Sequence, residues 1–194
     1  RIRDVFEQAE INRNIANIKK YEEKTLRQEV EKRFGCSLYF PNGYISRKVS
    51  PDFIWYSLET PKTSQGIFIY TYPYSGQKID GNYLISKRNE FLKQNVPGSL
   101  PNTYMITSPV VSPSIQVLKQ NNQDKLTLIQ MRGLWDVQND YMGGPFVSQT
   151  VLDTANRRIV TIEAYVYAPK GDKRNLIRQT YSVLRTFELK AGNP

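Results

Sequence analysis

Hydrophobic residues in the first part of the chain recur every three or four positions, and residues 2–34 contain neither glycine nor proline. This spacing is typical of an amphipathic α-helix. Gly35 follows directly, where a left-handed residue that ends a helix is common. One continuous helix would reach roughly 50 Å, so we expect either a long helix or one that is kinked near residues 19–23. Residues 1–35 are therefore predicted to form an N-terminal helical segment.

From residue 36 onward the period changes to two, which is typical of strands. Residues 37–40 and 44–49 flank Pro41-Asn42-Gly43, which favours a tight turn, so the pattern predicts a β-hairpin there. Asp80 is placed to cap a helix that runs to about residue 95. Two more strands of this first half are predicted over residues 53–58 and 66–74.

The second half follows an irregular crossing, because residues 97–114 contain four prolines. Asp172 is placed to cap a last helix that runs to about residue 187. Between the crossing and this helix, strands are predicted over residues 115–118, 125–137, 146–152 and 158–167, with a polar turn at 121–124.

The two halves resemble each other. Each reads strand, strand, strand, helix, and a Tyr-x-Tyr strand precedes the helix in both. The predicted fold class is α+β: a mainly antiparallel sheet built from two such halves, with the long N-terminal helix packed on it. The predicted organisation is one compact domain with an N-terminal helix (1–35), a first half (36–96), a Pro-rich crossing (97–114) and a second half (115–194).

Composition excludes several kinds of chemistry. The chain has no His and one Cys, which excludes Ser-His-Asp and Cys-His nucleophiles and zinc sites built from His or paired Cys. Cys36 cannot form an internal disulfide, and we interpret it as a buried apolar residue. With 13 Tyr and 8 Phe, the chain is predicted to fold rather than to be disordered. We expect no metal and no cofactor.

The net charge of +9 is spread along the chain. The densest positions lie at predicted turns, and we interpret them as a solvated basic surface. Nucleic-acid binding is the alternative for these residues, with affinity falling steeply with salt. The residues concerned are Arg157, Arg158, Lys170, Lys173 and Arg174.

Alternation along two strands places tyrosines on one face of each. If the halves are related, these rows lie on equivalent faces and form either an aromatic platform for a peptide, a sugar or bases, or the surface on which the N-terminal helix lands. The residues of this candidate binding face are Tyr70, Tyr72, Tyr74, Tyr165 and Tyr167.

A second candidate lies between residues 132 and 146. Asp136 and Asp140 are candidates for the acid and base of a carboxylate-dependent hydrolase, but along a strand they would lie ~13 Å apart. Hydrolytic carboxylate pairs work at roughly 5–9.5 Å. The structural alternative is a hairpin corner in which Arg132 pairs with one Asp. The candidate loop residues are Arg132, Trp135, Asp136, Asp140, Gly143 and Gly144.

The run from Arg132-Gly-Leu-Trp-Asp-Val to Asp140-Tyr-Met-Gly-Gly-Pro-Phe-Val, followed by Tyr165-Val-Tyr-Ala-Pro-Lys-Gly-Asp-Lys-Arg-Asn-Leu, resembles the Bacteroidetes domain-of-unknown-function family numbered 4837. Members of that family are longer, begin with a lipoprotein-type signal and have no assigned activity. The resemblance implies that this chain is the C-terminal portion of an envelope lipoprotein, in the periplasm or on the outer membrane. Membrane attachment would then come only from a lipid anchor outside this chain, and no catalytic residue is implied.

These observations lead to three functional hypotheses. The first is a non-enzymatic, envelope-associated binding or structural domain whose partner is another envelope protein or a peptide. The second is an enzyme that uses Asp136 and Asp140. The third is nucleic-acid binding, which an envelope location would make irrelevant in the cell.

Overall fold

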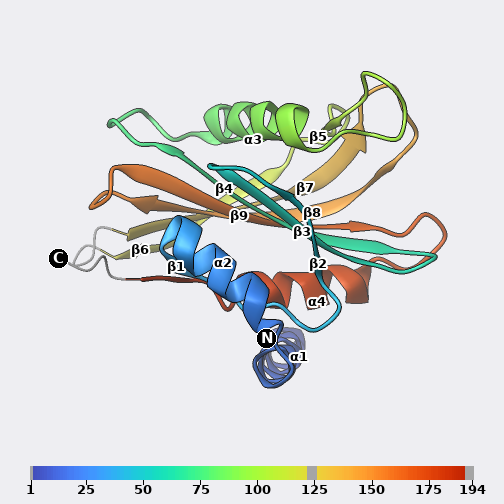
Figure 1. The fold of residues 1–194 in the computed structure, drawn as a ribbon, viewed down its shortest axis with the longest axis horizontal. Coiled ribbons are helices and arrows are strands. Elements are labelled where there is room, and N and C mark those ends of the chain that lie inside the picture. The colour runs from blue at the N-terminus through green and yellow to red at the C-terminus, as the bar shows by residue number, and fades with distance from the viewer. Residues whose placement is uncertain (1, 122–125, 191–194) are drawn as a thin grey trace.

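The computed structural model describes residues 2–121 and 126–190, and in these residues eight strands form one antiparallel sheet with helices on both faces (Figure 1). The strand order is β2-β3-β4-β9-β8-β7-β5, and β6 pairs with another part of β7. The strands are β2 (Ile45–Val49), β3 (Phe53–Glu59), β4 (Ser64–Pro73), β5 (Met105–Thr107), β6 (Ser114–Asn121), β7 (Leu126–Val137), β8 (Gly143–Asp153) and β9 (Arg158–Tyr167).

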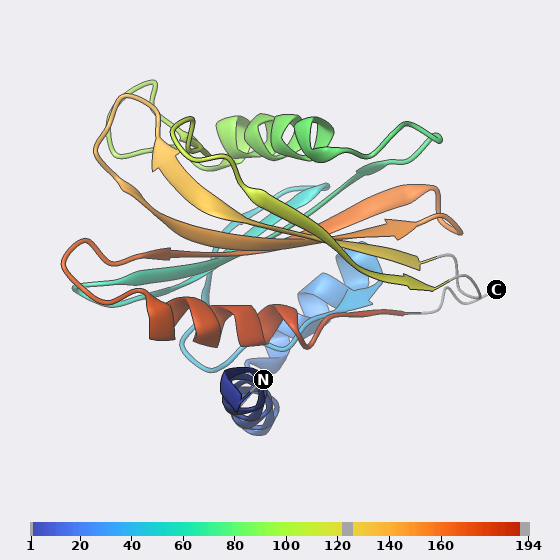
Figure 2. The same ribbon diagram turned by 180° about the vertical axis from the view of Figure 1, so that it is seen from behind.

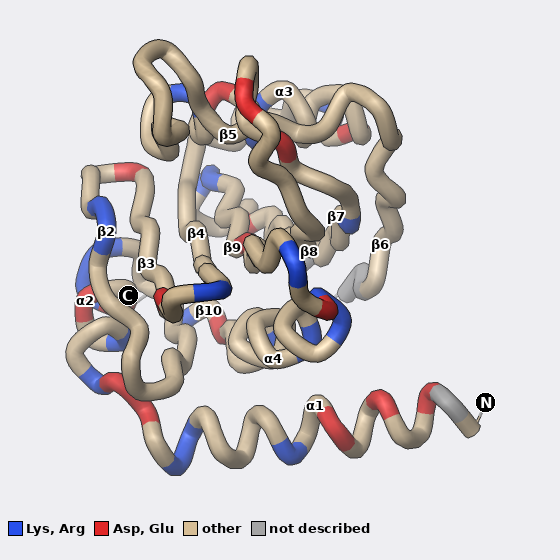
Figure 3. The backbone as a smooth tube through the Cα atoms, turned by 90° about the vertical axis from the view of Figure 1, so that its right-hand side faces the viewer, with Lys and Arg blue, Asp and Glu red and all other residues tan. Residues whose placement is uncertain are grey.

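Four helices complete the described part of the fold. Helix α3 (Gly81–Asn95) covers one face of the sheet, and α2 (Lys24–Phe34) and α4 (Arg174–Leu184) lie on the other (Figure 2). Helix α1 (Ile2–Lys20) packs on α4 and lies farther from the sheet (Figure 3). The predicted α+β class, with a mainly antiparallel sheet and an N-terminal helix packed on it, is confirmed.

The N-terminal segment is kinked where the sequence predicted. The chain leaves α1 at Tyr21, and α2 begins at Lys24. At the end of α2, Gly35 adopts φ 58°, and its N–H donates to the carbonyl of Glu31 at 3.0 Å. Glycine tolerates this left-handed conformation because it has no Cβ.

The hairpin predicted around Pro41-Asn42-Gly43 is wrong. The turn exists, but the two-residue strand before it, β1 (Cys36–Ser37), pairs with β10 (Glu188–Leu189) near the other end of the chain. Leu38 and Phe40 are fully buried in the core between the sheet and α2 and α4. Burial of these side chains therefore places residues 38–40 beneath the sheet. The residues after the turn form β2 and pair with β3.

The strand-strand-strand-helix order holds in both halves, as β2-β3-β4-α3 and β7-β8-β9-α4. The halves meet where β4 pairs with β9 along ten residues of each strand. Because β4 and β9 are antiparallel neighbours, a rotation that superposed the two sets of strands would turn about an axis perpendicular to the sheet. Such a rotation would place both helices on the same face of the sheet. Because α3 and α4 lie on opposite faces (Figure 1), no rotation superposes the complete halves.

Four smaller expectations from the sequence remain. Asp80 caps α3 as predicted, accepting the backbone N–H of Tyr83 at 3.0 Å. Helix α4 begins later than expected, at Arg174, whose N–H donates to the side chain of Asp172. The predicted crossing at 97–114 contains a short strand, β5. Most of the turn predicted at 121–124 lies outside the described residues.

Cys36 is fully buried, which confirms its interpretation as an apolar core residue. Burial raises the pKa of its thiol to about 12, although the nearby Arg158 guanidinium opposes this shift. The thiolate is the reactive form, so we expect no labelling by a disulfide reagent at pH 8 until the protein unfolds. Labelling kinetics in native buffer and in denaturant measure this. Rapid native labelling would contradict the buried position.

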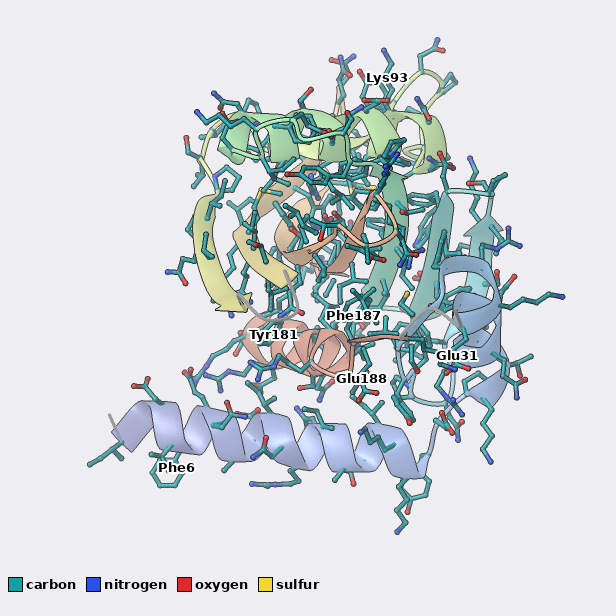
Figure 4. All side chains as sticks on the ribbon, turned by 90° about the vertical axis from the view of Figure 1, so that its left-hand side faces the viewer. Phe6, Glu31, Lys93, Tyr181, Phe187 and Glu188 are labelled. Atoms are coloured by element: carbon teal, nitrogen blue, oxygen red, sulfur yellow. The ribbon has the colours of Figure 1, made fainter. Side chains whose placement is uncertain are left out.

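The first half of α1 is held to α4 mainly by charge. The guanidinium of Arg178 contacts the carboxylates of Glu7 and Glu10, whereas Ile2, Val5 and Phe6 are 77%, 68% and 71% exposed. Figure 4 shows Phe6 pointing away from α4. Little apolar surface therefore fixes this end of the helix.

We expect Arg178→Ala to release the first turns of α1. Exposed ion pairs contribute roughly 0–1 kcal/mol, so global stability should change little, while limited proteolysis before residue 14 becomes faster. Lys173→Ala, in the segment just before α4, is the matched control. Unchanged proteolysis of α1 in Arg178→Ala would contradict this account.

Candidate functional site

The tyrosine rows lie in the core beneath α3. Pairing of Phe68 with Glu163 and of Tyr70 with Thr161 places both rows on the same face. This face is covered by α3 and not by the N-terminal helix, because α3 supplies the complementary apolar stripe: the Phe91 ring stacks on Tyr70 with centroids 4.7 Å apart. Tyr70, Tyr72 and Tyr165 are 2%, 6% and 3% exposed, and Tyr74 and Tyr167 are half-buried. The predicted aromatic binding face is therefore not available as a surface.

A buried ion pair lies beside these tyrosines. Arg88 of α3 and Glu163 of β9 are both fully buried, and the guanidinium meets the carboxylate through two hydrogen bonds of 2.8 and 2.7 Å. Arg88 also donates to the hydroxyl of Thr107 and lies over the ring of Phe146, 3.8 Å from its centroid. Burial raises the pKa of the Glu163 carboxyl, and Arg88 partly offsets this. The pair joins α3 to the centre of the sheet.

The candidate loop does not assemble one site. Trp135 is buried, and its indole N–H donates to the carbonyl of Val166 at 3.2 Å. A Cβ on Gly144 would lie 2.1 Å from the Val166 carbonyl oxygen, so only glycine lets the backbone at this position pack against that carbonyl and the Trp135 indole. A Cβ on Gly143 would lie 2.9 Å from Asp136 Oδ1. These residues shape the β7–β8 corner.

Asp136 and Asp140 both line a shallow hollow of about 330 Å³ at this corner. Both oxygens of Asp140 have partners, since Oδ2 accepts from Ser99 Oγ at 2.9 Å and Oδ1 from the N–H of Tyr141 at 2.7 Å. Asp140 thus fixes the loop. The expected pairing of Arg132 with an Asp is wrong: its Nε donates to Gln130 at 2.7 Å, on the face of the sheet toward α4.

The basic candidates are divided between the two ends of β9. Arg157 and Arg158 lie at its start, whereas Lys170, Lys173 and Arg174 follow its end, and a ten-residue strand spans roughly 30 Å. Arg158 is also used internally, since it donates to Asp153 at 2.8 Å and to the carbonyl of Phe34 at 2.6 Å. The five residues do not form one patch.

Other kinds of site are also missing from the described residues. Within 2–121 and 126–190, no three acidic or cysteine side chains gather as a metal site would require. In the same ranges, no helix combines the length and apolar character needed to cross a membrane.

Strand β6 lies at an edge of the sheet, next to β7. In the described part of the chain this strand pairs only with β7 (Figure 2). Its register places Ile115 and Val117 on the α3 side and Ser114 and Gln116 on the α4 side. All four are exposed, Val117 by 62%. An edge strand with apolar side chains and unpaired backbone groups is a template for pairing with another chain.

Two arginines lie near this edge on the α4 side. The guanidinium of Arg132 lies 4.9 Å from the ring centroid of Tyr181, and Arg185, which directly follows α4, is exposed. Burial alone would raise the pKa of the Tyr181 phenol, but hydrogen bonds from Arg185 and Gln130 and the charges of both arginines outweigh it, so the pKa is lowered. Neither arginine forms an ion pair within the described residues.

A groove of about 740 Å³ continues from the edge beneath the sheet. Leu118 of β6 and Leu128 of β7 form its upper wall, and the segment after α4 forms the lower one, including Phe187 and Glu188 (Figure 4). Sequence reasoning missed this edge and groove. The available signal was the group of apolar residues at 110–118, which the prolines of the crossing obscured.

Comparison with known proteins gives a family and remote structural likenesses. The Ran-binding protein Mog1p of Saccharomyces cerevisiae matches with a TM-score of 0.48 and 11% identity, over 80% of this chain and 90% of that one. A point mutant of Mog1 matches with a TM-score of 0.46 and 11% identity, over 81% and 92%. A STAR-related lipid transfer protein of Xanthomonas axonopodis matches with a TM-score of 0.34 and 8% identity, over 77% of this chain and 97% of that one. At these values the likenesses say nothing about function.

A search of curated protein sequences finds no match. The profile of a protein family described as a domain of unknown function, DUF4837, matches residues 23–186. This range covers the whole eight-stranded sheet and the helices α2, α3 and α4. It leaves out α1 and the residues after 186. The chain therefore belongs to the DUF4837 family.

Proposed function

We propose that this chain is a non-enzymatic binding domain that takes an extended segment of a partner protein as an added strand along β6. The observation that carries the proposal is the open apolar edge, where Ser114, Ile115, Gln116 and Val117 are all exposed. Half of the backbone N–H and C=O groups of an edge strand point outward without strand partners. An added strand satisfies them, and its alternate side chains supply specificity.

The opposite edge of the sheet is protected against such pairing. Strand β2 carries Arg47 and Lys48, and its register shifts between Ser46 and Lys48. The Arg47 guanidinium is fixed beside the strand by Ser57 and by Glu59, the latter at 3.2 Å. Charged side chains and bulges are common devices that prevent edge-to-edge association. Strand β6 also has a register shift, after Val117, but its residues 114–117 carry no charge, and this difference supports β6 as the edge used for binding.

The chemistry of the partner follows from the two faces of β6. The register shifts after Val117, so residues 114–117 form the regular part of the edge. On the α3 side, Ile115 and Val117 favour apolar side chains of the added strand. On the α4 side, small Ser114 lies beside Arg132 on β7, and Arg185 is nearby, which favours acidic side chains. The partner segment therefore alternates apolar and acidic residues.

A random-peptide phage-display selection tests this proposal. We expect selected peptides to alternate apolar and acidic residues, to bind less tightly as salt rises, and to lose affinity about tenfold or more on Val117→Lys. Ile45→Lys is the matched control, because Ile45 is an exposed apolar residue on the protected edge. Selected peptides that bind Val117→Lys and the unchanged chain equally would contradict the proposal.

We also propose a location in the cell envelope. Its support is the resemblance of residues 132–178 to family members that begin with a lipoprotein-type signal. Fractionation of the native cells, with an antibody against this chain, tests the location. Recovery with the envelope fraction is expected, and recovery with the cytosol would contradict it.

A further inference from the structure

Another cavity lies on the other side of the molecule from β6, between α1 and α4. Its volume is about 330 Å³, which is within the range of small-molecule sites. The walls come from α1, the segment after α2, strands β3 and β4, and α4. Ile18, Leu58 and Val183 supply apolar surface within it.

The polar lining of this cavity consists of carboxamides and tyrosines. The five carboxamides are Asn14, Asn17, Asn42, Gln65 and Gln179. No Asp, Glu, Lys or Arg is among the described residues that line it. Burial raises the pKa of the Tyr44 phenol, so this group also stays neutral. The cavity therefore has a mainly apolar lining that carries uncharged polar groups.

Part of this lining is held in place and part of it is free. Gln65 is buried, and its Oε1 accepts the hydroxyl of Thr180 at 2.9 Å. Asn14 donates to Ser182 at 3.3 Å. The side chains of Asn17, Asn42 and Gln179 are exposed and make no hydrogen bond to another described residue, so their amides are available to a ligand.

These properties restrict the ligand class. An ionised ligand would lose hydration without meeting an opposite charge, which is costly. A purely apolar ligand would leave the amides unpaired on burial. Each carboxamide both donates and accepts, as a sugar hydroxyl does. Apolar walls beside such groups suit the C–H faces of a sugar ring.

We propose that this cavity binds a neutral sugar, either free or as the terminal residue of a glycan. The site is separate from β6, so it stands or falls independently of strand addition. It also gives α1 a role as a wall of the site.

Two arms of one experiment test the proposal on the full chain. Isothermal titration and ligand-observed NMR use methyl glycosides of glucose, galactose, mannose and N-acetylglucosamine, and a glycan array presents the same sugars as terminal residues. Glucuronate and glucosamine are the charged comparators. The site variants are Gln179→Leu and the double variant Asn17→Leu/Gln179→Leu, and Gln94→Leu, an exposed position on α3, is the matched control.

We expect a neutral sugar to bind in at least one arm, with affinity about tenfold lower in Gln179→Leu and unchanged in Gln94→Leu. Binding on the array alone would identify the ligand as a glycan terminus. Binding in neither arm up to about 10 mM, or tighter binding of the charged comparators, would overturn the proposal. So would equal affinity in the site variants. Amide chemical-shift changes around Tyr44 locate the sugar without any substitution.

Discussion

Replacement of Arg88 with Met is expected to lower the free energy of unfolding by about 3–5 kcal/mol, because it leaves the Glu163 carboxylate buried without its partner. Both side chains are fully buried, and the carboxylate loses two hydrogen bonds of 2.8 and 2.7 Å. Urea unfolding followed by circular dichroism measures this change. A loss below 1 kcal/mol would show that the pair does not hold α3 to the sheet.

Two further measurements separate the charge effect from simple loss of packing. The double variant Arg88→Met/Glu163→Leu removes both charges, so it should recover most of the lost stability. The second measurement is the pH dependence of the free energy of unfolding of Arg88→Met. Burial already raises the pKa of Glu163, and loss of Arg88 raises it further, so the folded state takes up a proton before the unfolded state does. The loss of stability in Arg88→Met, relative to the unchanged chain, should therefore become smaller as pH falls from 7 toward 5.

Replacement of Gly66 with Ala is expected to lower the free energy of unfolding by about 3 kcal/mol, at the upper end of overpacking effects. A Cβ at this position on β4 would lie 2.0 Å from the Tyr165 ring of the neighbouring strand. The ring cannot move aside, because it stacks on Phe68 at 4.9 Å and its hydroxyl accepts the Trp55 indole N–H at 3.0 Å.

Gly171→Ala is the control for this substitution, since its new Cβ would meet only Ala168, at an ordinary 3.7 Å. Its effect should stay within about 0.5 kcal/mol. In a Tyr165→Leu background, the additional cost of Gly66→Ala should largely disappear, because the clashing ring is gone. An equal cost in both backgrounds would show that the ring is not the obstacle.

The hydrophobic period was sufficient to predict the elements because most of them bury one regular face. Strand β9 was predicted with the bounds that the structure shows, and α3 was predicted with its Asp80 cap. The period does not say which helix covers which face. Both α3 and the N-terminal helices carry apolar stripes, so the tyrosines were expected to lie beneath the wrong helix or to be exposed.

The local pattern of hydrophobic and polar residues does not show which distant segments pair with each other. Ser37 pairs with Glu188, whereas the adjacent sequence favoured a hairpin with the residues after Gly43. The Arg88–Glu163 pair left a signal that was not used. Glu163 stands within the apolar strand 159–166, and Arg88 lies on the buried side of α3 with Leu84 and Phe91. A charge within a buried run requires a partner, but sequence alone does not identify it.

The candidate site was missed for a related reason. A strand that is apolar on an exposed edge has the same pattern as one that is apolar in the core. Only the strand order shows that β6 and the charged strand β2 both lie at edges of the sheet.

Amide hydrogen exchange, measured with and without a selected peptide, tests strand addition at β6 most directly. Backbone pairing predicts that the peptide slows exchange at alternate amides within residues 114–117 and leaves β2 unchanged. Slower exchange at β2 or α1, with none at β6, would contradict the proposed binding edge.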